Sequence, residues 1–156
     1  MNLVWHYAPW ATLSQIVTAG ALLPGDPGRA GEAPLLWFSA RQDWEPTATK
    51  YVMDGGQPRR MTFIEHKQRF GCVRFGLSAD DHRLLPWIEA CRAAHMRFTD
   101  RRTLDAASRR VGANPVEWSA SMQAIPLAGI RFQVLADTWG EGDMTAAARL
   151  WTARRG

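Results

Sequence analysis

Short strand-forming and helix-forming stretches follow one another in this chain in no regular order, and this irregularity constrains the fold most. Strand patterns are expected at residues 3–7, 35–39, 60–64, 71–75, 117–120 and 130–136, and helical patterns at residues 13–18, 84–94, 100–111 and 144–155. Regular alternation of strand and helix would predict a doubly wound parallel sheet. Its absence predicts an α+β fold, with short strands in two packed sheets and helices at the periphery.

Length and composition favour one domain. The chain has 156 residues, of which 46% are hydrophobic and 22% are charged, and this is enough to build a core of its own. Neither an internal repeat nor a linker with a shift in composition divides the sequence, so residues 1–156 are expected to form a single domain. Glycine and proline gather in residues 25–34, which are expected to form a surface loop.

Three features of the sequence exclude membrane and secreted classes. No run approaches the roughly 20 apolar residues that cross a bilayer, so no membrane association is expected. The first nine residues lack the basic start and apolar stretch of a secretory signal. Cys72 and Cys91 are the only cysteines, too few for a disulfide framework, and a reducing, cytoplasmic location is expected.

The chain is basic, with a net charge of +4, and its positive charge is almost entirely arginine. Arginine binds phosphate well through its planar fork of N–H donors, so the composition is compatible with an anionic partner. A codon bias toward arginine explains the same composition. The expected helix at residues 100–111 concentrates four of these side chains, Arg101, Arg102, Arg109 and Arg110.

Short motifs in the first third of the chain resemble the ADP-ribosyltransferase fold. The segments HYAP at residues 6–9 and GALLP at 20–24 resemble the start of the DNA-modifying toxin group called DarT, where a histidine ending the first strand precedes a helix and a G-x-L turn. LWFS at 36–39 is similar to a strand motif of poly(ADP-ribose) polymerases. WEPTATKY at 44–51 is similar to the helix start that carries the second motif of the fold.

The resemblance implies an NAD-dependent mono-ADP-ribosyltransferase, with NAD as a substrate and a protein or a nucleic acid as the acceptor. This reaction breaks the bond between nicotinamide and ribose through an oxocarbenium-like transition state, as in glycoside cleavage. The protein must hold the dinucleotide, orient the nicotinamide and provide a carboxylate near the developing positive charge.

Three residues are candidates for the central roles in this chemistry. The resemblance implies that His6 bonds a ribose hydroxyl of the adenosine half, and a neutral imidazole suits a hydroxyl because it both donates and accepts. The third motif of the family is a glutamate on a late strand, which matches Glu117. Glu45 is the rival carboxylate, since it lies beside Trp44 in the second motif.

Seven further residues are candidates for contacts with NAD. Hydroxyls suit ribose or amide groups, aromatic rings suit nicotinamide, and a guanidinium on a strand suits pyrophosphate. In that order the candidates are Ser39 and Thr47; Trp37, Trp44 and Tyr51; and Arg74. Tyr7, beside His6 in the HYAP segment, is a further candidate for binding NAD. Core packing, strand ends and helix caps are the alternative roles for such residues.

Other functions stay open at this stage. A non-catalytic module on the same fold would bind nucleic acid or protein through the arginine-rich helix. An NAD glycohydrolase, or an enzyme that transfers an RNA 2′-phosphate to NAD, would use the same pocket. His66, Cys72, Cys91 and His95 could in principle bind zinc, but their spacing matches no pair-of-pairs motif, so no metal is expected.

Overall fold

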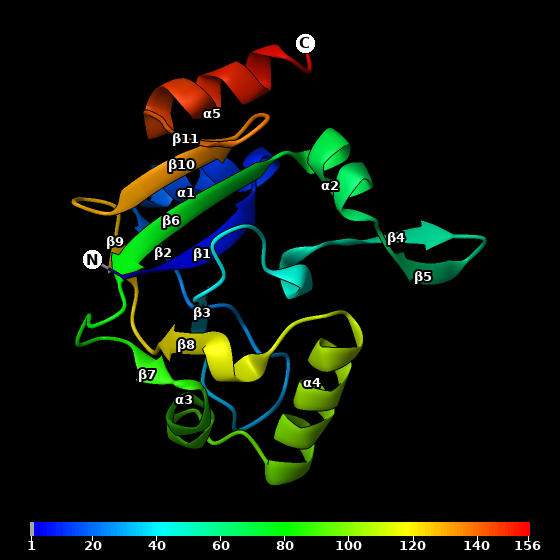
Figure 1. Cartoon of the computed structure of the whole chain (residues 1–156), viewed down its shortest axis with the longest axis vertical. Helices are drawn as coiled ribbons and strands as arrows, with labels where there is room; N and C mark the ends of the chain where they lie inside the picture. The colour runs from blue at the N-terminus through cyan, green and yellow to red at the C-terminus, as the bar shows by residue number, and fades with distance from the viewer. Residues whose placement is uncertain (1) are drawn as a thin grey trace.

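A seven-stranded antiparallel sheet runs through the computed structural model, which describes residues 2–156 (Figure 1). Its strands, in spatial order, are β11 (Trp139–Glu141), β10 (Arg131–Leu135), β6 (Cys72–Ser78), β1 (Leu3–Pro9), β3 (Leu36–Ser39), β8 (Trp118–Ser121) and β7 (Leu85–Pro86). The described residues also form two separate two-stranded ribbons. In one, β2 (Ala21–Leu22) pairs with β9 (Ile125–Pro126), and in the other β4 (Tyr51–Asp54) pairs with β5 (Gln57–Arg60).

The α+β class is therefore confirmed, but the expected arrangement of the strands in two packed sheets is wrong. The central strand β1 pairs on one side with β6 and on the other with β3, and it thereby joins the strands into one sheet. The two ribbons form no strand pair with this sheet; in Figure 1 the ribbon of β4 and β5 extends away from it, whereas Leu22 and Ile125 of the other ribbon belong to the main buried cluster.

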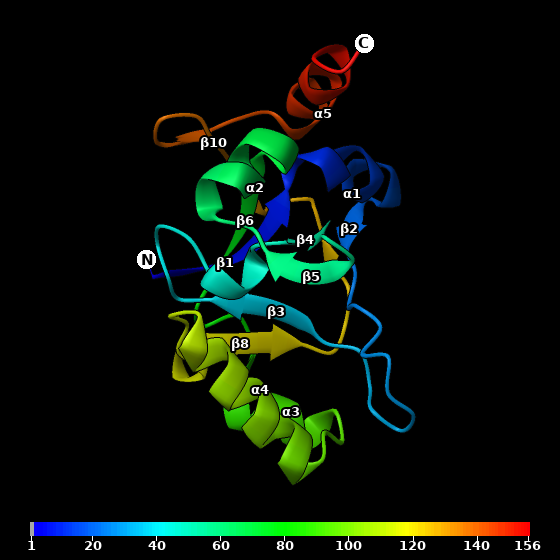
Figure 2. The same cartoon turned by 90° about the vertical axis from the view of Figure 1, so that its right-hand side faces the viewer.

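Helices cover the two ends of the sheet. The described chain forms five α-helices, namely α1 (Leu13–Ala19), α2 (Phe63–Phe70), α3 (Trp87–Ala93), α4 (Phe98–Arg110) and α5 (Met144–Ala153). In Figure 2, α1 and α5 lie at one end of the molecule and α3 and α4 at the other, beside β8. No helix in the part of the chain that the structure describes combines the length and the apolar character that a membrane crossing needs.

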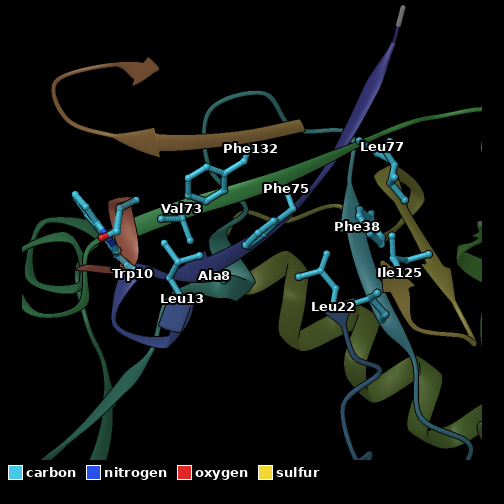
Figure 3. Close-up of a cluster of buried hydrophobic side chains, with 14 residues drawn as sticks. Ala8, Trp10, Leu13, Leu22, Phe38, Val73, Phe75, Leu77, Ile125 and Phe132 are labelled. Atoms are coloured by element: carbon cyan, nitrogen blue, oxygen red, sulfur yellow. The ribbon is translucent and has the colours of Figure 1, made fainter. Parts of the chain in front are cut away.

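The main core lies between the sheet and helices α1 and α5 (Figure 3). Leu13 of α1 packs there against Val73 and Phe75 of β6, and all three are fully buried. Successive strand residues point to opposite faces, so Arg74 and Gly76 face away from this core. The sheet therefore has an apolar face and a second face that carries charged and aromatic side chains.

Most expected elements are present with shifted ends. The helix expected at residues 13–18 is confirmed, and Gly20 ends it in the left-handed conformation, with φ of 70°, that glycine adopts without strain. The strand expected at residues 60–64 is wrong, because Thr62 and Glu65 form a capping box that begins α2.

The helix expected at residues 84–94 begins only after Pro86. Leu85 and Pro86 instead pair with β8 as the edge strand β7, which a proline tolerates at a sheet edge. The loop expected at residues 25–34 is confirmed, apart from one isolated bridge between Gly25 and Leu35.

Gly76 is expected to be intolerant of a side chain. It lies opposite Trp5 in the pairing of β1 with β6, and an added Cβ would lie 2.7 Å from Cζ3 of the buried indole. Forcing extra atoms into a packed site costs roughly 1–3 kcal/mol. Gly76→Ala should therefore lower the free energy of unfolding by about that amount, measured by urea denaturation.

Gly140→Ala is the matched control, since Gly140 also lies in the sheet but has no atom within 4 Å of an added Cβ. Equal stability of the two variants would show that the Trp5 ring moves aside freely.

Candidate functional site

Strands β1 and β3 separate after a very short contact. In the described chain Trp5 and Ser39 are their one paired position, whereas β1 pairs with β6 along its whole length. The His6 side chain bridges the opening, with its Nδ1 2.8 Å from the carbonyl oxygen of Trp37. A carbonyl oxygen accepts and does not donate, so Nδ1 carries the proton and Nε2 keeps a free lone pair in the neutral ring.

A cavity of about 360 Å³ lies at this separation. Its size falls in the range of sites for small molecules and cofactors. Six of the ten expected site residues line it, namely His6, Tyr7, Trp37, Ser39, Glu45 and Thr47. Residues 6–7 are far in the sequence from the neighbouring segments 37–39 and 45–47, and the fold brings all three together.

His6 presents an uncharged acceptor to this cavity. Burial lowers the pKa of His6, and the positive charge of Lys50 acts in the same direction, while the hydrogen bond to Trp37 opposes both. Within residues 2–156, Nε2 has no hydrogen-bond partner and is not enclosed. The imidazole can therefore accept a hydrogen bond from a ligand hydroxyl at neutral pH.

Glu45 forms the buried acidic wall of the cavity, with 6% of its surface exposed. Its Oε2 accepts hydrogen bonds from Ser39 Oγ at 2.7 Å and from Trp118 Nε1 at 3.2 Å. Its Oε1 accepts from the backbone N–H of Thr47 at 3.3 Å and from Thr47 Oγ1 at 2.9 Å. None of the ion pairs in the described residues includes Glu45, so neutral donors alone compensate its charge.

Glu117 lies outside the cavity wall. It directly precedes β8, and its Oε2 is 3.0 Å from Nε of Arg41, which also donates to the carbonyl oxygen of Gly112 at 2.6 Å. Both side chains of the ion pair are about one third exposed, at 33% for Arg41 and 36% for Glu117. The two candidate carboxylates therefore differ: Glu45 lines the cavity and has no ion-pair partner, whereas Glu117 is paired with Arg41.

Three other expected site residues also lie outside the wall. Trp44 packs beside the cavity, where its Nε1 donates to Thr49 Oγ1 at 3.0 Å. Tyr51 is 63% exposed on the ribbon strand β4. Arg74 is buried on the second face of the sheet, where its guanidinium lies between the rings of Trp5 and Trp139.

Sequence reasoning missed the other six residues of the wall, namely Trp5, Phe38, Ala48, Lys50, Leu104 and Trp118. Lys50 carries the one cationic side chain among the residues that line the cavity, and this side chain is exposed to solvent. Its position inside the WEPTATKY segment was a usable signal. Leu104 and Trp118 gave no such signal, because helix α4 and strand β8 reach the cavity only through tertiary contacts.

A second cavity, of about 490 Å³, adjoins the first. It lies between the loop at residues 25–35 and helix α4, and Trp37 and Leu104 belong to the walls of both cavities. Arg29, Asp26 and Glu32 give it charged edges around an apolar floor. The two cavities together suit an elongated ligand with two lobes.

The remaining polar candidates do not form a second centre. Within residues 2–156, no group of three or more His, Cys, Asp or Glu side chains could hold a metal ion. Burial raises the pKa of Cys72 to about 12 and that of Cys91 to about 11, so both thiols stay protonated. On α4, Arg109 pairs with Asp105 at 2.9 Å, and this ion pair neutralises part of the positive charge of the helix.

Comparison of the chain with protein-family models, with curated proteins and with solved structures finds no match in any of the three.

His66 packs behind the cavity wall, against the backbone of Lys50 and the ring of Trp44. It is fully buried, its Nδ1 accepts the backbone N–H of Lys50 at 3.2 Å, and its ring packs 5.1 Å from that of Trp44. Burial lowers the pKa of His66 to about 4, and the charge of Lys50 contributes in the same direction. A neutral imidazole is thus built into this part of the fold.

Acidification from pH 7 to pH 5 is expected to lower the free energy of unfolding by about 2 kcal/mol through His66 alone. The pKa of His66 lies near 4 in the fold against an ordinary value of 6.5, so at pH 5 the unfolded chain binds a proton that the folded chain does not. This stability is fully present above pH 6.5 and is lost as the pH falls toward 4. Denaturant titrations at both pH values measure it.

His66→Phe is the comparison variant, because it removes the titrating group and keeps an aromatic ring. Its loss on acidification should be smaller than that of the wild type by about 2 kcal/mol. His6 titrates in both proteins and cancels from this difference. If the wild type and His66→Phe lost the same stability on acidification, the fold would not lower the pKa of His66.

Proposed function

We propose that the protein is an NAD-dependent mono-ADP-ribosyltransferase whose nicotinamide–ribose site is the cavity between β1 and β3. The observation that carries the proposal is the pairing, in one cavity, of a neutral imidazole acceptor from the first motif with a buried carboxylate from the second motif. These are the two groups that the chemistry requires, one to hold a sugar hydroxyl and one to face a developing cation.

The shape of the site supports a dinucleotide as the ligand. NAD has two ring systems joined by a pyrophosphate, and the two adjoining cavities offer separate spaces of about 360 and 490 Å³. The dividing residue Trp37 supplies an aromatic wall to both spaces. Lys50 supplies a cation for the pyrophosphate oxygens in place of Arg74, whose N–H groups are engaged with Gln133, Tyr7 and the carbonyl oxygen of Gln42.

The proposed reaction uses the negative charge of Glu45. The bond between the ribose carbon and the nicotinamide nitrogen breaks, the electron pair leaves with nicotinamide, and positive charge develops on the ribose. Glu45 is buried and has no ion-pair partner in the described residues, so its charge stabilises this cation. The acceptor nucleophile then bonds to the ribose carbon and releases its proton to solvent.

The His6 contact gives the first test. His6→Ala removes the free Nε2 acceptor, and the loss of one hydrogen bond to a hydroxyl should weaken NAD binding by about tenfold, or about 1.4 kcal/mol. Titration calorimetry on the folded variant measures it. His82→Ala is the control, since His82 is exposed and belongs to neither cavity. Absence of wild-type binding at millimolar NAD would rule out the proposed function.

The choice between the carboxylates gives the second test. Glu45→Gln keeps the size of the side chain and removes its charge, so release of nicotinamide should fall at least about a hundredfold in kcat. Glu117→Gln removes a charge that Arg41 already neutralises, and turnover should change by less than about threefold. Chromatography of nicotinamide and ADP-ribose measures both.

The opposite ranking of the two variants would assign the catalytic charge to Glu117 and require Arg41 to release it. Free ADP-ribose as the sole product, whatever acceptor is offered, would instead indicate an NAD glycohydrolase. Salt-sensitive binding of nucleic acid without binding of NAD would favour the non-catalytic module.

A further inference from the structure

Side chains from the sheet hold the backbone of the segment that joins β3 to Glu45. Three consecutive carbonyl oxygens, those of residues 41, 42 and 43, each accept a hydrogen bond from a different side chain. Tyr7 Oη donates to the first at 2.5 Å, Arg74 Nη1 donates to the second, and Trp139 Nε1 donates to the third at 2.7 Å.

The donors come from three strands but share one face of the sheet. Tyr7 of β1 and Arg74 of β6 are directly opposite each other, and Gln133 of β10 is opposite Arg74 on its other side. Trp139 lies on the neighbouring edge strand β11. In Figure 1 the loop that follows β3 passes in front of β1, over this face.

Arg74 is fixed within this face. Its Nε and Nη2 both donate to Oε1 of Gln133, at 2.8 and 2.6 Å, and its guanidinium lies 3.9 Å from the ring centroid of Trp5 and 4.3 Å from that of Trp139. None of the ion pairs in residues 2–156 includes Arg74. A cation with this geometry directs its charge at the backbone carbonyl of Gln42.

Tyr7 is also constrained within this face. The hydroxyl of Tyr7 also receives a hydrogen bond from Arg74 at 3.4 Å, and burial raises the pKa of Tyr7 to about 12, so the phenol remains a donor. The Trp5 indole donates to the side chain of Gln42 at 2.9 Å, which adds a fourth contact to the same segment.

We infer that Tyr7, Arg74 and Trp139 are positioning residues that hold the Arg41–Asp43 backbone and thereby orient Arg41 and also Glu45, which lies two residues beyond Asp43. The inference rests on the proposed function for its catalytic consequence. Arg41 pairs with Glu117, and Glu45 forms the acidic wall of the cavity. Arg74 thus acts through the backbone of the loop and not as a ligand for pyrophosphate.

A physical argument favours this assignment over simple packing. Residues 40–45 lie outside the regular strands, so no ladder of backbone bonds defines their conformation. Ordering a free loop costs roughly 1–2 kcal/mol for each residue. Side-chain hydrogen bonds to successive carbonyls offset this cost only when the donors are themselves rigid. The guanidinium of Arg74 and the rings of Tyr7 and Trp139 are rigid because they pack against one another.

Trp139→Phe and Arg74→Gln test the inference, because neither residue lines the cavity. The first readout is hydrogen exchange at the amides of Ala40 and Arg41, which are bonded to Glu117 O at 2.9 Å and Ser39 Oγ at 3.2 Å. Exchange should accelerate at least about tenfold in both variants. The second is the NMR signal of the Trp118 indole N–H, which should shift as its bond to Glu45 is disturbed.

Trp10→Phe is the matched control. It also removes an indole hydrogen bond, from Trp10 Nε1 to the carbonyl oxygen of Ala147 at 2.8 Å, but on helix α5. It should leave both readouts and kcat unchanged at a temperature where all variants are folded. Unchanged exchange and an unchanged Trp118 signal in Trp139→Phe and Arg74→Gln would overturn the inference.

Turnover separates the positioning role from ligand binding and from mere stability. A positioning role predicts that both variants lose about tenfold in kcat with a Kd for NAD within about threefold of wild type. A raised Kd in Arg74→Gln alone, with normal exchange, would mean that Arg74 binds the pyrophosphate. Wild-type protein without NAD turnover would end the proposed function, while the exchange and indole readouts would still decide whether these residues hold the loop.

Discussion

The separation of β1 from β3 after a single residue pair is the constraint on which the site depends. At that point a side chain replaces the backbone ladder: the imidazole of His6 bonds the Trp37 carbonyl that a neighbouring strand would otherwise have bonded. An unpaired buried carbonyl is costly, so this hydrogen bond makes the opening tolerable. The same hydrogen bond sets the tautomer of His6 and leaves Nε2 free for a ligand.

Two opposite charges are buried on the two sides of one short loop. Glu45 is compensated by hydroxyl, indole and backbone donors, and Arg74 by carbonyl oxygens and aromatic faces. A buried charge without a counter-ion is stable only when dipoles around it are already oriented. Such preorganisation leaves the charge of Glu45 available to a bound ligand. A direct salt bridge, as between Arg41 and Glu117, would have cancelled it.

The proposed enzyme follows from the combination of these features. The opening provides a space, His6 provides an acceptor in it, and Glu45 provides an uncancelled negative charge. The neighbouring cavity extends the space past Trp37 toward the loop at residues 25–35. The held loop is the element on which the precise position of the charge depends, since a shift of about 1 Å can cost about a hundredfold in rate.

The sequence by itself determined the α+β class, the helix that Gly20 ends and the three motif segments whose residues meet in the cavity, because these depend on local patterns. It misjudged residues 60–64, where a capping box outweighed strand-forming residues. Tertiary structure alone decided that Glu117 pairs with Arg41 and that Arg74 bonds Gln133 and does not line the cavity, since both depend on partners from distant parts of the chain. Local pattern sets the conformation of a segment, but the partner of a side chain is set by strand order and register.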